Sequence, residues 1–165
     1  MKISVISDTH IPERAKEIPS EIMGALKGSD MIIHAGDLVD LSVLAQLKTI
    51  CGNVKAVWGN MDPQEVRKKL PEKELIKIGS HKIGVMHGYG PAERLLDTVS
   101  AAFKGDGADI IIFGHSHQSL NKKKDGILFL NPGSLTDTIL SKYNSYGVLE
   151  IDEKSQKVEA KIIKL

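Results

Sequence analysis

The sequence predicts an α/β protein in which two packed β-sheets are flanked by helices, and three observations lead to this prediction. The chain has 165 residues, of which 41% are hydrophobic, so we expect one domain over residues 1–165 with a substantial core. The first third alternates short apolar runs with helical patterns, which is typical of βαβ units. The later part contains closely spaced strands and hairpin turns, and two sheets accommodate these better than one open sheet.

The first third predicts three buried strands separated by helices. The expected strands are Lys2–Ser7, Met31–His34 and Val54–Trp58. The expected helices are Glu21–Lys27, which Gly28 is suited to end, and Leu41–Ile50, which Asp40 can cap. Strands joined through helices are usually parallel neighbours in one sheet.

The rest of the chain predicts hairpins and one longer helix. The expected helix is Pro91–Phe103, because proline favours the first helical turn and Gly105 can stop the helix. Hairpin turns are indicated at Gly79-Ser80 and at Asp125-Gly126. The expected strands are Glu74–Ile78, Lys82–Met86, Ile110–Phe113, Leu120–Lys123, Ile127–Leu130, Tyr146–Ile151 and Val158–Ile163.

Composition excludes several classes of protein. Lys and Arg number 22 against 21 Asp and Glu, and neither half is strongly basic, which argues against general nucleic-acid binding. Apolar runs such as Ile110–Phe113 are far shorter than a membrane span, and we expect no signal segment at the start. A single cysteine, Cys51, excludes an internal disulfide and favours a cytoplasmic protein in which it is an ordinary thiol.

Polar residues of metal-ligand type follow five of the expected buried strands. They are Asp8, His10, Asp37, Asn60, His87, His115 and His117. Each alone could be a helix cap, a turn residue or a polar loop residue. Because the carboxyl ends of strands in α/β sheets open onto one crevice, we expect them to converge there. Carboxylate, amide and imidazole ligands suit Mn, Fe, Zn, Ni or Co, and seven ligands exceed the needs of one ion.

The motifs around these residues resemble those of a known family. Asp-x-His, Gly-Asp, Gly-Asn-x-Asp, His-Gly and Gly-His-x-His, in this order, are similar to the blocks of the calcineurin-like metallophosphoesterases. The small size, the Asn-Pro-Gly-Ser segment ending at Ser134 and the lack of histidine in the third block resemble the YfcE-type phosphodiesterase branch. The resemblance implies a four-layer αββα sandwich of two mixed sheets and a dinuclear metal centre. It leaves the role of Ser134 open.

Carried over by position, the resemblance implies a role for each ligand. Asp8, His10 and His117 would hold the first ion. Asn60, His87 and His115 would hold the second, and Asp37 would bridge both. The ions would be divalent, with Mn²⁺ expected first and Ni²⁺, Co²⁺, Fe²⁺ or Zn²⁺ as alternatives. A metal-bridging hydroxide would attack phosphorus in line and cleave a small phosphodiester.

One departure from the family affects the expected substrate. Larger members carry a histidine in the third block that protonates the leaving oxygen, and this chain has Met61 there. Methionine carries no proton, so we expect phosphodiesters with acidic leaving groups to react faster than alkyl phosphomonoesters. Asp62 is left without its histidine partner, and we expect it to cap the following helix.

Five other positions are less informative. His34 ends the second strand and either steers a metal ligand from behind or is a buried polar residue. His81 lies next to a hairpin turn, where we expect it to be solvated. Lys122, Lys123 and Lys124 fit a solvated hairpin tip, with attraction of an anionic substrate as the alternative.

An enzyme is not the only protein class that fits these motifs. The alternative is a protein-interaction scaffold of the same fold with weak catalysis, as in the related retromer subunit. A degenerate site should have lost at least one metal ligand, whereas this chain retains all seven. A nuclease fits less well, because the basic surface and the extra substrate-binding domain are missing. By analogy with small members of the branch, the chain could form a homodimer.

Overall fold

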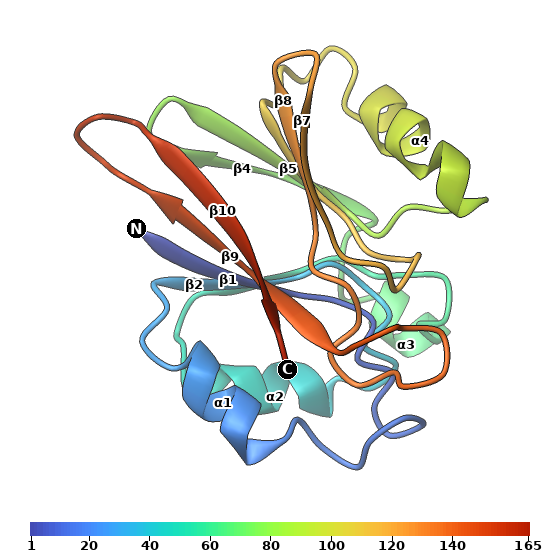
Figure 1. The fold of residues 1–165 in the computed structure, drawn as a ribbon. Coiled ribbons are helices and arrows are strands. Elements are labelled where there is room, and N and C mark those ends of the chain that lie inside the picture. Colours follow the sequence, from blue (N-terminus) through green and yellow to red (C-terminus); the bar gives the residue numbers. More distant parts are fainter.

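The computed structural model describes residues 1–165 and contains two mixed five-stranded sheets packed face to face (Figure 1). The first sheet has the order β10-β9-β1-β2-β3 and the second the order β4-β5-β6-β8-β7. The first consists of β1 (Lys2–Ile6), β2 (Met31–His34), β3 (Val54–Ala56), β9 (Ser145–Ile151) and β10 (Val158–Lys164). The second consists of β4 (Lys73–Ile78), β5 (His81–Met86), β6 (Ile110–Ile112), β7 (Leu120–Lys124) and β8 (Ile127–Asn131).

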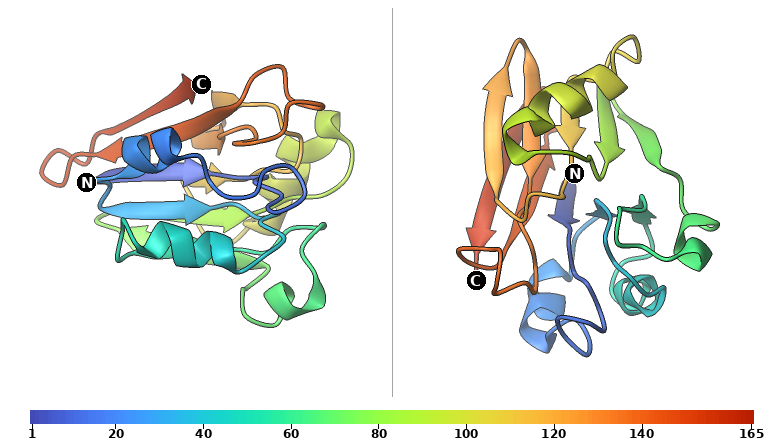
Figure 2. Two further views of the ribbon diagram at one scale, coloured as in Figure 1. Left: turned by 90° about the horizontal axis from the view of Figure 1, so that it is seen from below. Right: turned by 90° about the vertical axis from the view of Figure 1, so that its right-hand side faces the viewer.

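Helices cover the outer faces of both sheets, so the molecule has four layers in the order α-β-β-α (Figures 1 and 2). Helices α1 (Ser20–Leu26) and α2 (Ser42–Lys48) pack on the first sheet. The 3₁₀ turn η1 (Ala92–Arg94) leads into α4 (Leu95–Ala102), which packs on the second sheet. A fourth helix, α3 (Gln64–Arg67), follows β3. None of these helices has the length and apolar character needed to cross a membrane.

Three hydrophobic clusters fill the three interfaces between the layers. In β1, Ile3 and Val5 join the cluster between the sheets, whereas Ile6 joins the cluster against α1 and α2, because alternate side chains of a strand face opposite sides. The third cluster packs Val99 and Phe103 of α4 against the second sheet. The alternation of apolar residues therefore specifies the layers.

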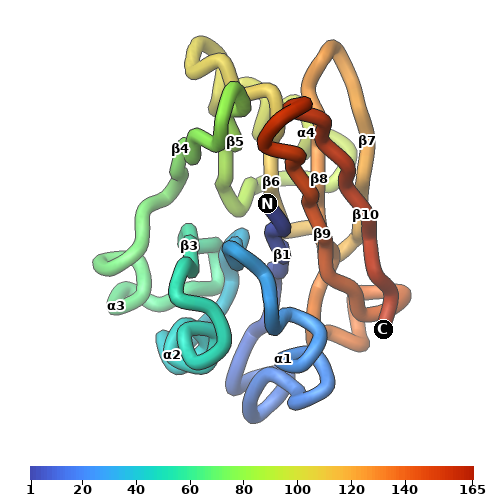
Figure 3. Tube along the Cα trace, turned by 90° about the vertical axis from the view of Figure 1, so that its left-hand side faces the viewer, coloured from blue at the N-terminus to red at the C-terminus, as the bar shows by residue number.

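Parallel pairing places several strand ends at one end of the sandwich. β1, β2 and β3 are parallel neighbours, and so are β5, β6 and β8. The hairpin strands extend the sheets in antiparallel fashion, with β9 and β10 on the first and β4 and β7 on the second. β7 and β10 run side by side along one flank (Figure 3), where the Asn121 amide donates to the Ala160 carbonyl at 2.6 Å.

Several elements differ from the sequence-based expectations. The helix expected over Pro91–Phe103 is split, because its first turn is the 3₁₀ turn η1. The helix expected over Leu41–Ile50 is α2, Ser42–Lys48, and Asp40 accepts the Ser42 N–H at 2.7 Å without being the N-cap residue. The third strand ends at Ala56, because the Trp58 N–H donates to Pro71 instead of to a sheet neighbour. Helix α3 is the helix expected after Asp62, and it begins at Gln64 with Pro63 as its N-cap residue.

The end of the sandwich where β5 begins contains a contact between the two sheets. The Gln156 side-chain oxygen, from the β9–β10 turn, accepts the Ser80 N–H at 2.8 Å. The His81 ring lies 2.5 Å from an Asp109 oxygen through Nδ1 and 2.8 Å from the Gln156 carbonyl through Nε2. The expectation that His81 is solvated was therefore wrong, because both ring nitrogens are hydrogen-bonded. Glycine suits position 79, since its φ of 57° is a backbone conformation that other residues rarely adopt.

Candidate metal centre

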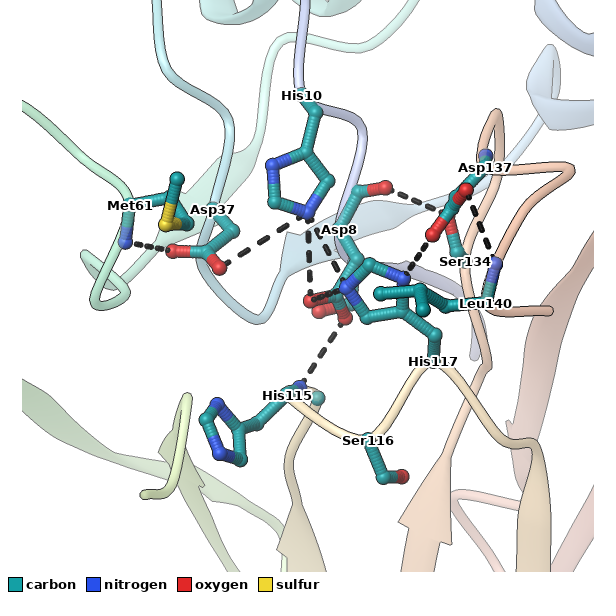
Figure 4. A network of polar contacts seen from close by, with 12 residues as sticks. Asp8, His10, Asp37, Met61, His115, Ser116, His117, Ser134, Asp137 and Leu140 are labelled. Carbon is teal, nitrogen blue, oxygen red and sulfur yellow. Dashed lines mark hydrogen bonds and ion pairs between the residues drawn. The ribbon is translucent and has the colours of Figure 1, made fainter. Parts of the chain in front are cut away.

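The seven residues expected to bind metal lie on five loops at one end of the sandwich. Asp8 and His10 follow β1, Asp37 follows β2 and Asn60 follows β3, so four come from the first sheet. The other three come from the second sheet, since His87 follows β5, and His115 and His117 follow β6. Figure 4 shows the central side chains pointing toward one another from opposite sides of the site.

Asp8, His10 and His117 form the first cluster, and all three are buried. The Nε2 atoms of His10 and His117 lie 3.2 Å apart. His117 Nε2 also lies 3.2 Å from Asp8 Oδ1, and His10 Nε2 lies 3.9 Å from the same oxygen. Two imidazole nitrogens and a carboxylate oxygen thus face one point.

Asp8, Asp37 and His87 form a second cluster beside the first. His87 Nε2 lies 3.1 Å from Asp37 Oδ2 and 3.8 Å from Asp8 Oδ1. Asp37 Oδ2 is also 3.9 Å from His10 Nε2. Both carboxylates therefore lie between the two groups of histidines, whereas the resemblance implies sharing by Asp37 alone.

Asn60 and His115 adjoin this second cluster. The His115 Nδ1 atom lies 2.8 Å from Asn60 Oδ1, and its Nε2 atom lies 3.0 Å from the Gly90 carbonyl. The His115 ring packs edge-on against His87, with ring centroids 5.4 Å apart. The donor atoms of Asn60 and His115 thus face each other here instead of joining the Asp8, Asp37 and His87 cluster.

Unpaired buried atoms show that this cluster suits divalent cations. Asp8 Oδ1 and His87 Nε2 are buried and form no hydrogen bond, although polar atoms that are removed from water almost always have a partner. The two atoms face the same space as the His10 and His117 nitrogens. An acceptor-rich cavity of carboxylate oxygens and imidazole nitrogens is the chemistry that transition-metal ions select.

The backbone of these loops is strained where the ligands lie. Five of the seven residues have positive φ: Asp8 (53°), His10 (42°), Asp37 (56°), His115 (71°) and His117 (55°). Side chains other than glycine rarely adopt this region, and such strain concentrates at functional sites. Val39, a β-branched residue in the loop after β2, has φ 72°. The fold thus holds these residues in a backbone conformation that non-glycine residues disfavour.

Hydrogen bonds on the far side of two rings fix their orientation. His87 Nδ1 lies 2.7 Å from the Ala35 carbonyl, so it donates its proton there and leaves Nε2 facing the carboxylates. His117 Nδ1 bonds to the carboxylate of Asp137 in the same way. Sequence reasoning missed Asp137, which is buried in the loop after β8. Only its position shortly after the Asn-Pro-Gly-Ser segment could have suggested it.

Asp62 has a different role from the one expected. It does not cap α3, whose N-cap residue is Pro63 without a side-chain bond. Its carboxylate instead accepts the backbone N–H groups of Asp37 (3.0 Å), Gly59 (2.7 Å) and Val39 (2.6 Å). Asp62 therefore joins the loops after β2 and β3 and positions Asp37.

The loop after β8 supports the first cluster from behind. The Ser134 hydroxyl donates to the Asp8 carbonyl at 2.7 Å and accepts the Asp137 N–H at 3.0 Å. The Asn131 amide donates to the Gly114 carbonyl at 2.8 Å. The Asn-Pro-Gly-Ser segment thus fixes the loops that carry Asp8 and the Gly-His-x-His motif.

His34 is buried behind the site. Its Nδ1 accepts the Gly36 N–H at 3.2 Å, so Nε2 carries the proton and donates to Thr9 Oγ1 at 3.0 Å. Thr9 lies between Asp8 and His10, so His34 supports their loop without touching either side chain. Burial lowers the pKa of His34 to about 4, so the ring is neutral at physiological pH.

The electrostatics of the site favour added positive charge. Burial by itself lowers the pKa of His87, but the neighbouring Asp8 and Asp37 carboxylates raise it to about 9. Burial likewise opposes charge on His117, yet the neighbouring Asp8 and Asp137 carboxylates raise the pKa of that ring. Without a cation, protons on these rings compensate the buried carboxylates, so metal binding should displace protons.

Comparisons with known proteins agree with this geometry. The family model of the calcineurin-like phosphoesterase superfamily domain matches residues 1–154. A protein of Methanothermobacter thermautotrophicus named "Probable metallophosphoesterase" is 39% identical over 99% of this chain and 92% of its own.

Two solved structures resemble the whole chain. Entamoeba histolytica Vps29 complexed with Zn²⁺ has a TM-score of 0.77 and 29% identity, covering 99% of both chains. A novel archaeal phosphodiesterase has a TM-score of 0.73 and 26% identity, covering 99% of this chain and 100% of its own. With the family match over most of its length, the chain belongs to the calcineurin-like phosphoesterase superfamily.

Proposed function

We propose that this protein is a dinuclear metal-dependent phosphodiesterase. The observation that carries the proposal is the pair of buried, unpaired atoms, Asp8 Oδ1 and His87 Nε2, within a cluster built from both sheets. Asp8, His10 and His117 would hold one ion, and Asp37 would be shared. The second ion would be held by Asn60, His87 and His115, once the His115 ring has rotated away from the Gly90 carbonyl. Mn²⁺ is the expected ion, with Ni²⁺, Co²⁺, Fe²⁺ and Zn²⁺ as alternatives.

When bound, the ions supply Lewis acidity that activates water and neutralises charge on the phosphoryl oxygens. The chain itself orients the site: Asp137 directs the His117 ring, the Ala35 carbonyl directs His87, and Asp62 positions Asp37. In the reaction, the oxygen of water forms a bond to phosphorus while the water loses a proton to solvent. The bond from phosphorus to the ester oxygen breaks, and the departing oxygen leaves as an anion that solvent protonates.

The leaving group receives no proton from Met61. The Met61 side chain is 53% exposed beside the site, and its backbone N–H donates to Asp37 Oδ1 at 2.7 Å. Figure 4 shows it next to Asp37. Aryl and other acidic leaving groups depart without protonation, so we expect aryl diesters to be cleaved much faster than alkyl monoesters. The substrate would be a small phosphodiester handled in the cytoplasm.

The test is hydrolysis of bis(p-nitrophenyl) phosphate by metal-stripped protein to which Mn²⁺, Ni²⁺, Co²⁺, Zn²⁺ or Mg²⁺ is returned separately. We expect metal-dependent turnover that is lost in Asp37→Ala and retained in Asp40→Ala, an exposed aspartate of the same loop. Turnover of p-nitrophenyl phosphate and of an alkyl monoester, measured alongside, checks the preference for diesters. Absence of turnover with every ion, although two ions are bound per chain, would refute the enzyme.

A second candidate function is a protein-binding scaffold. Large apolar side chains are exposed on three loops around the site: Met61 (53%), Tyr89 (62%), Ile139 (70%) and Leu140 (63%). Exposed apolar groups are common at protein interfaces, and a Vps29 structure is among the similar ones. Metal binding without turnover, together with a partner that protects these four residues from solvent, would favour this function. The same loops could instead join two copies of this chain in a homodimer, and analytical ultracentrifugation would measure the oligomeric state.

A further inference from the structure

A cavity of about 390 Å³ opens beside His117. Its lining includes Gln118 and Ser119, which follow the Gly-His-x-His motif, and Leu140, Lys142 and Tyr143, which precede β9. The volume is in the lower range of small-molecule sites. A larger cavity of about 560 Å³ beside Lys2 and Glu150 contains none of the expected metal ligands. Of these two cavities, the one that His117 lines is placed to hold part of a substrate whose phosphate is at the metal centre.

The charge around this cavity is positive. Lys142 lines it, and Lys164 Nζ lies 4.1 Å from the centre of the Tyr143 ring. No carboxylate lines the cavity. The hydrogen bond with Ser119, followed by the charges of Lys164 and Lys142, lowers the pKa of Tyr143. A ligand that fills the cavity should therefore carry negative charge.

The remaining lining suits a heteroaromatic ring. Leu140 is 63% exposed at the mouth, and Tyr143 is held by a hydrogen bond between its hydroxyl and Ser119 Oγ at 3.0 Å. Leu140 and the Tyr143 ring are the two apolar groups that line the cavity beside His117. The exposed Gln118 amide can both donate to and accept from the edge of one base. Apolar walls with a few polar groups are typical of sites for such ligands.

We infer that this cavity binds a nucleoside ester group of the substrate and that Lys142 contacts a second phosphate on it. The inference rests on the proposed phosphodiesterase function and narrows the substrate to nucleotide diesters that carry an additional terminal phosphate. The scissile phosphate occupies the metal centre, the base contacts Leu140 and Tyr143, and the terminal phosphate faces the ammonium group.

The test compares two dinucleotides, dithymidine monophosphate (TpT) and the same molecule with a 5′-phosphate (pTpT), with Mn²⁺-loaded protein. We expect kcat/KM to be higher for pTpT, and the ratio of the two values to fall about fivefold in Lys142→Met, as for the loss of one exposed ion pair. Lys104→Met, at an exposed lysine far from the cavity, should leave the ratio unchanged. Equal kcat/KM for both dinucleotides in the unmodified protein would overturn the inference.

A binding measurement separates this inference from the proposed function. Thymidine 3′,5′-bisphosphate is titrated into EDTA-treated protein, and amide NMR shifts are followed at Gln118 and Tyr143. We expect saturable shifts that Lys142→Met weakens. Binding without hydrolysis by any metal-loaded form would refute the phosphodiesterase and leave the nucleotide site. Hydrolysis of bis(p-nitrophenyl) phosphate without these shifts would refute the nucleotide site and leave the phosphodiesterase.

Discussion

Replacing Asp62 should damage both stability and metal binding, although this residue is not expected to touch an ion. Asp62→Ala removes the acceptor of three backbone N–H groups, those of Asp37, Val39 and Gly59. Each hydrogen bond to a charged group contributes roughly 1.5–3 kcal/mol. Burial raises the pKa of Asp62, so the cost of burying its charge offsets part of this energy. We therefore expect a loss near the lower limit, about 4 kcal/mol.

Asp62→Asn provides a milder version of the same change. An amide oxygen in place of Oδ2 keeps the bonds from Asp37 and Gly59, but the amide NH₂ then faces the Val39 N–H. We expect a loss of about 2 kcal/mol and a folded protein. Because the loop that carries Asp37 loses its contact at Val39, the metal affinity of the site should still fall. Since Asp62→Asn should remain folded, a loss of metal affinity in this variant reports the positioning of Asp37 and not unfolding.

The assay is urea unfolding in EDTA, followed by far-UV circular dichroism, with metal content of the folded variants measured by mass spectrometry. Glu13→Ala, at an exposed carboxylate, is the control and should behave as the unmodified protein does. A stability of Asp62→Ala within about 0.5 kcal/mol of the control, the usual range for surface changes, would refute the argument. Full metal occupancy of Asp62→Asn at a limiting metal concentration would also refute it.

Three further predictions concern other contacts. The pKa of His81 is raised, first by its hydrogen bond to Asp109. The stabilisation is therefore complete below about pH 6.5 and is lost as the pH rises through the folded-state pKa. The stability difference between the protein and His81→Gln should accordingly shrink from about pH 6.5 upward in urea titrations. Gly59→Ala would place a Cβ 2.2 Å from the carboxylate of Asp37, and it should abolish metal-dependent turnover of bis(p-nitrophenyl) phosphate. Asp137→Asn should weaken metal binding about 10–100-fold in calorimetry.

Each of these changes has a matched control or a contrary result. Gly24→Ala, in α1 with no atom within 4 Å of the added Cβ, should leave turnover intact. Asp97→Asn, at a carboxylate that is 78% exposed, should leave metal affinity unchanged. A pH-independent stability difference for His81→Gln would contradict the role given to its imidazolium form.

The parts of the fold that local pattern specifies could be predicted from the sequence. Ile110–Ile112 and Lys2–Ile6 are short apolar runs that form buried strands, and the polar residues after them converge because parallel strands end together. The bounds of the short helix Gln64–Arg67 could not be predicted, since four residues carry no periodicity.

Residues that act through distant partners could not be assigned from the sequence. The carbonyl that the His81 ring contacts belongs to Gln156, 75 positions away, and only the packing of the two sheets brings them together. Asp137 is 20 positions from His117 and belongs to a loop without a recognisable pattern. Asp62 ends a motif in which Met61 replaces the family's histidine, so its acceptance of backbone N–H groups had no local signal. Such roles depend on tertiary structure alone.

The division of the metal centre between the two sheets has a consequence for the durability of the protein. His10 and His117 are 107 positions apart in the chain, and ions bound between such residues would close a very long loop. The protein has a single cysteine and so no internal disulfide, but bound ions would serve as a reversible cross-link between its two halves. Its lifetime in the folded state would then follow the concentration of free divalent metal in its surroundings.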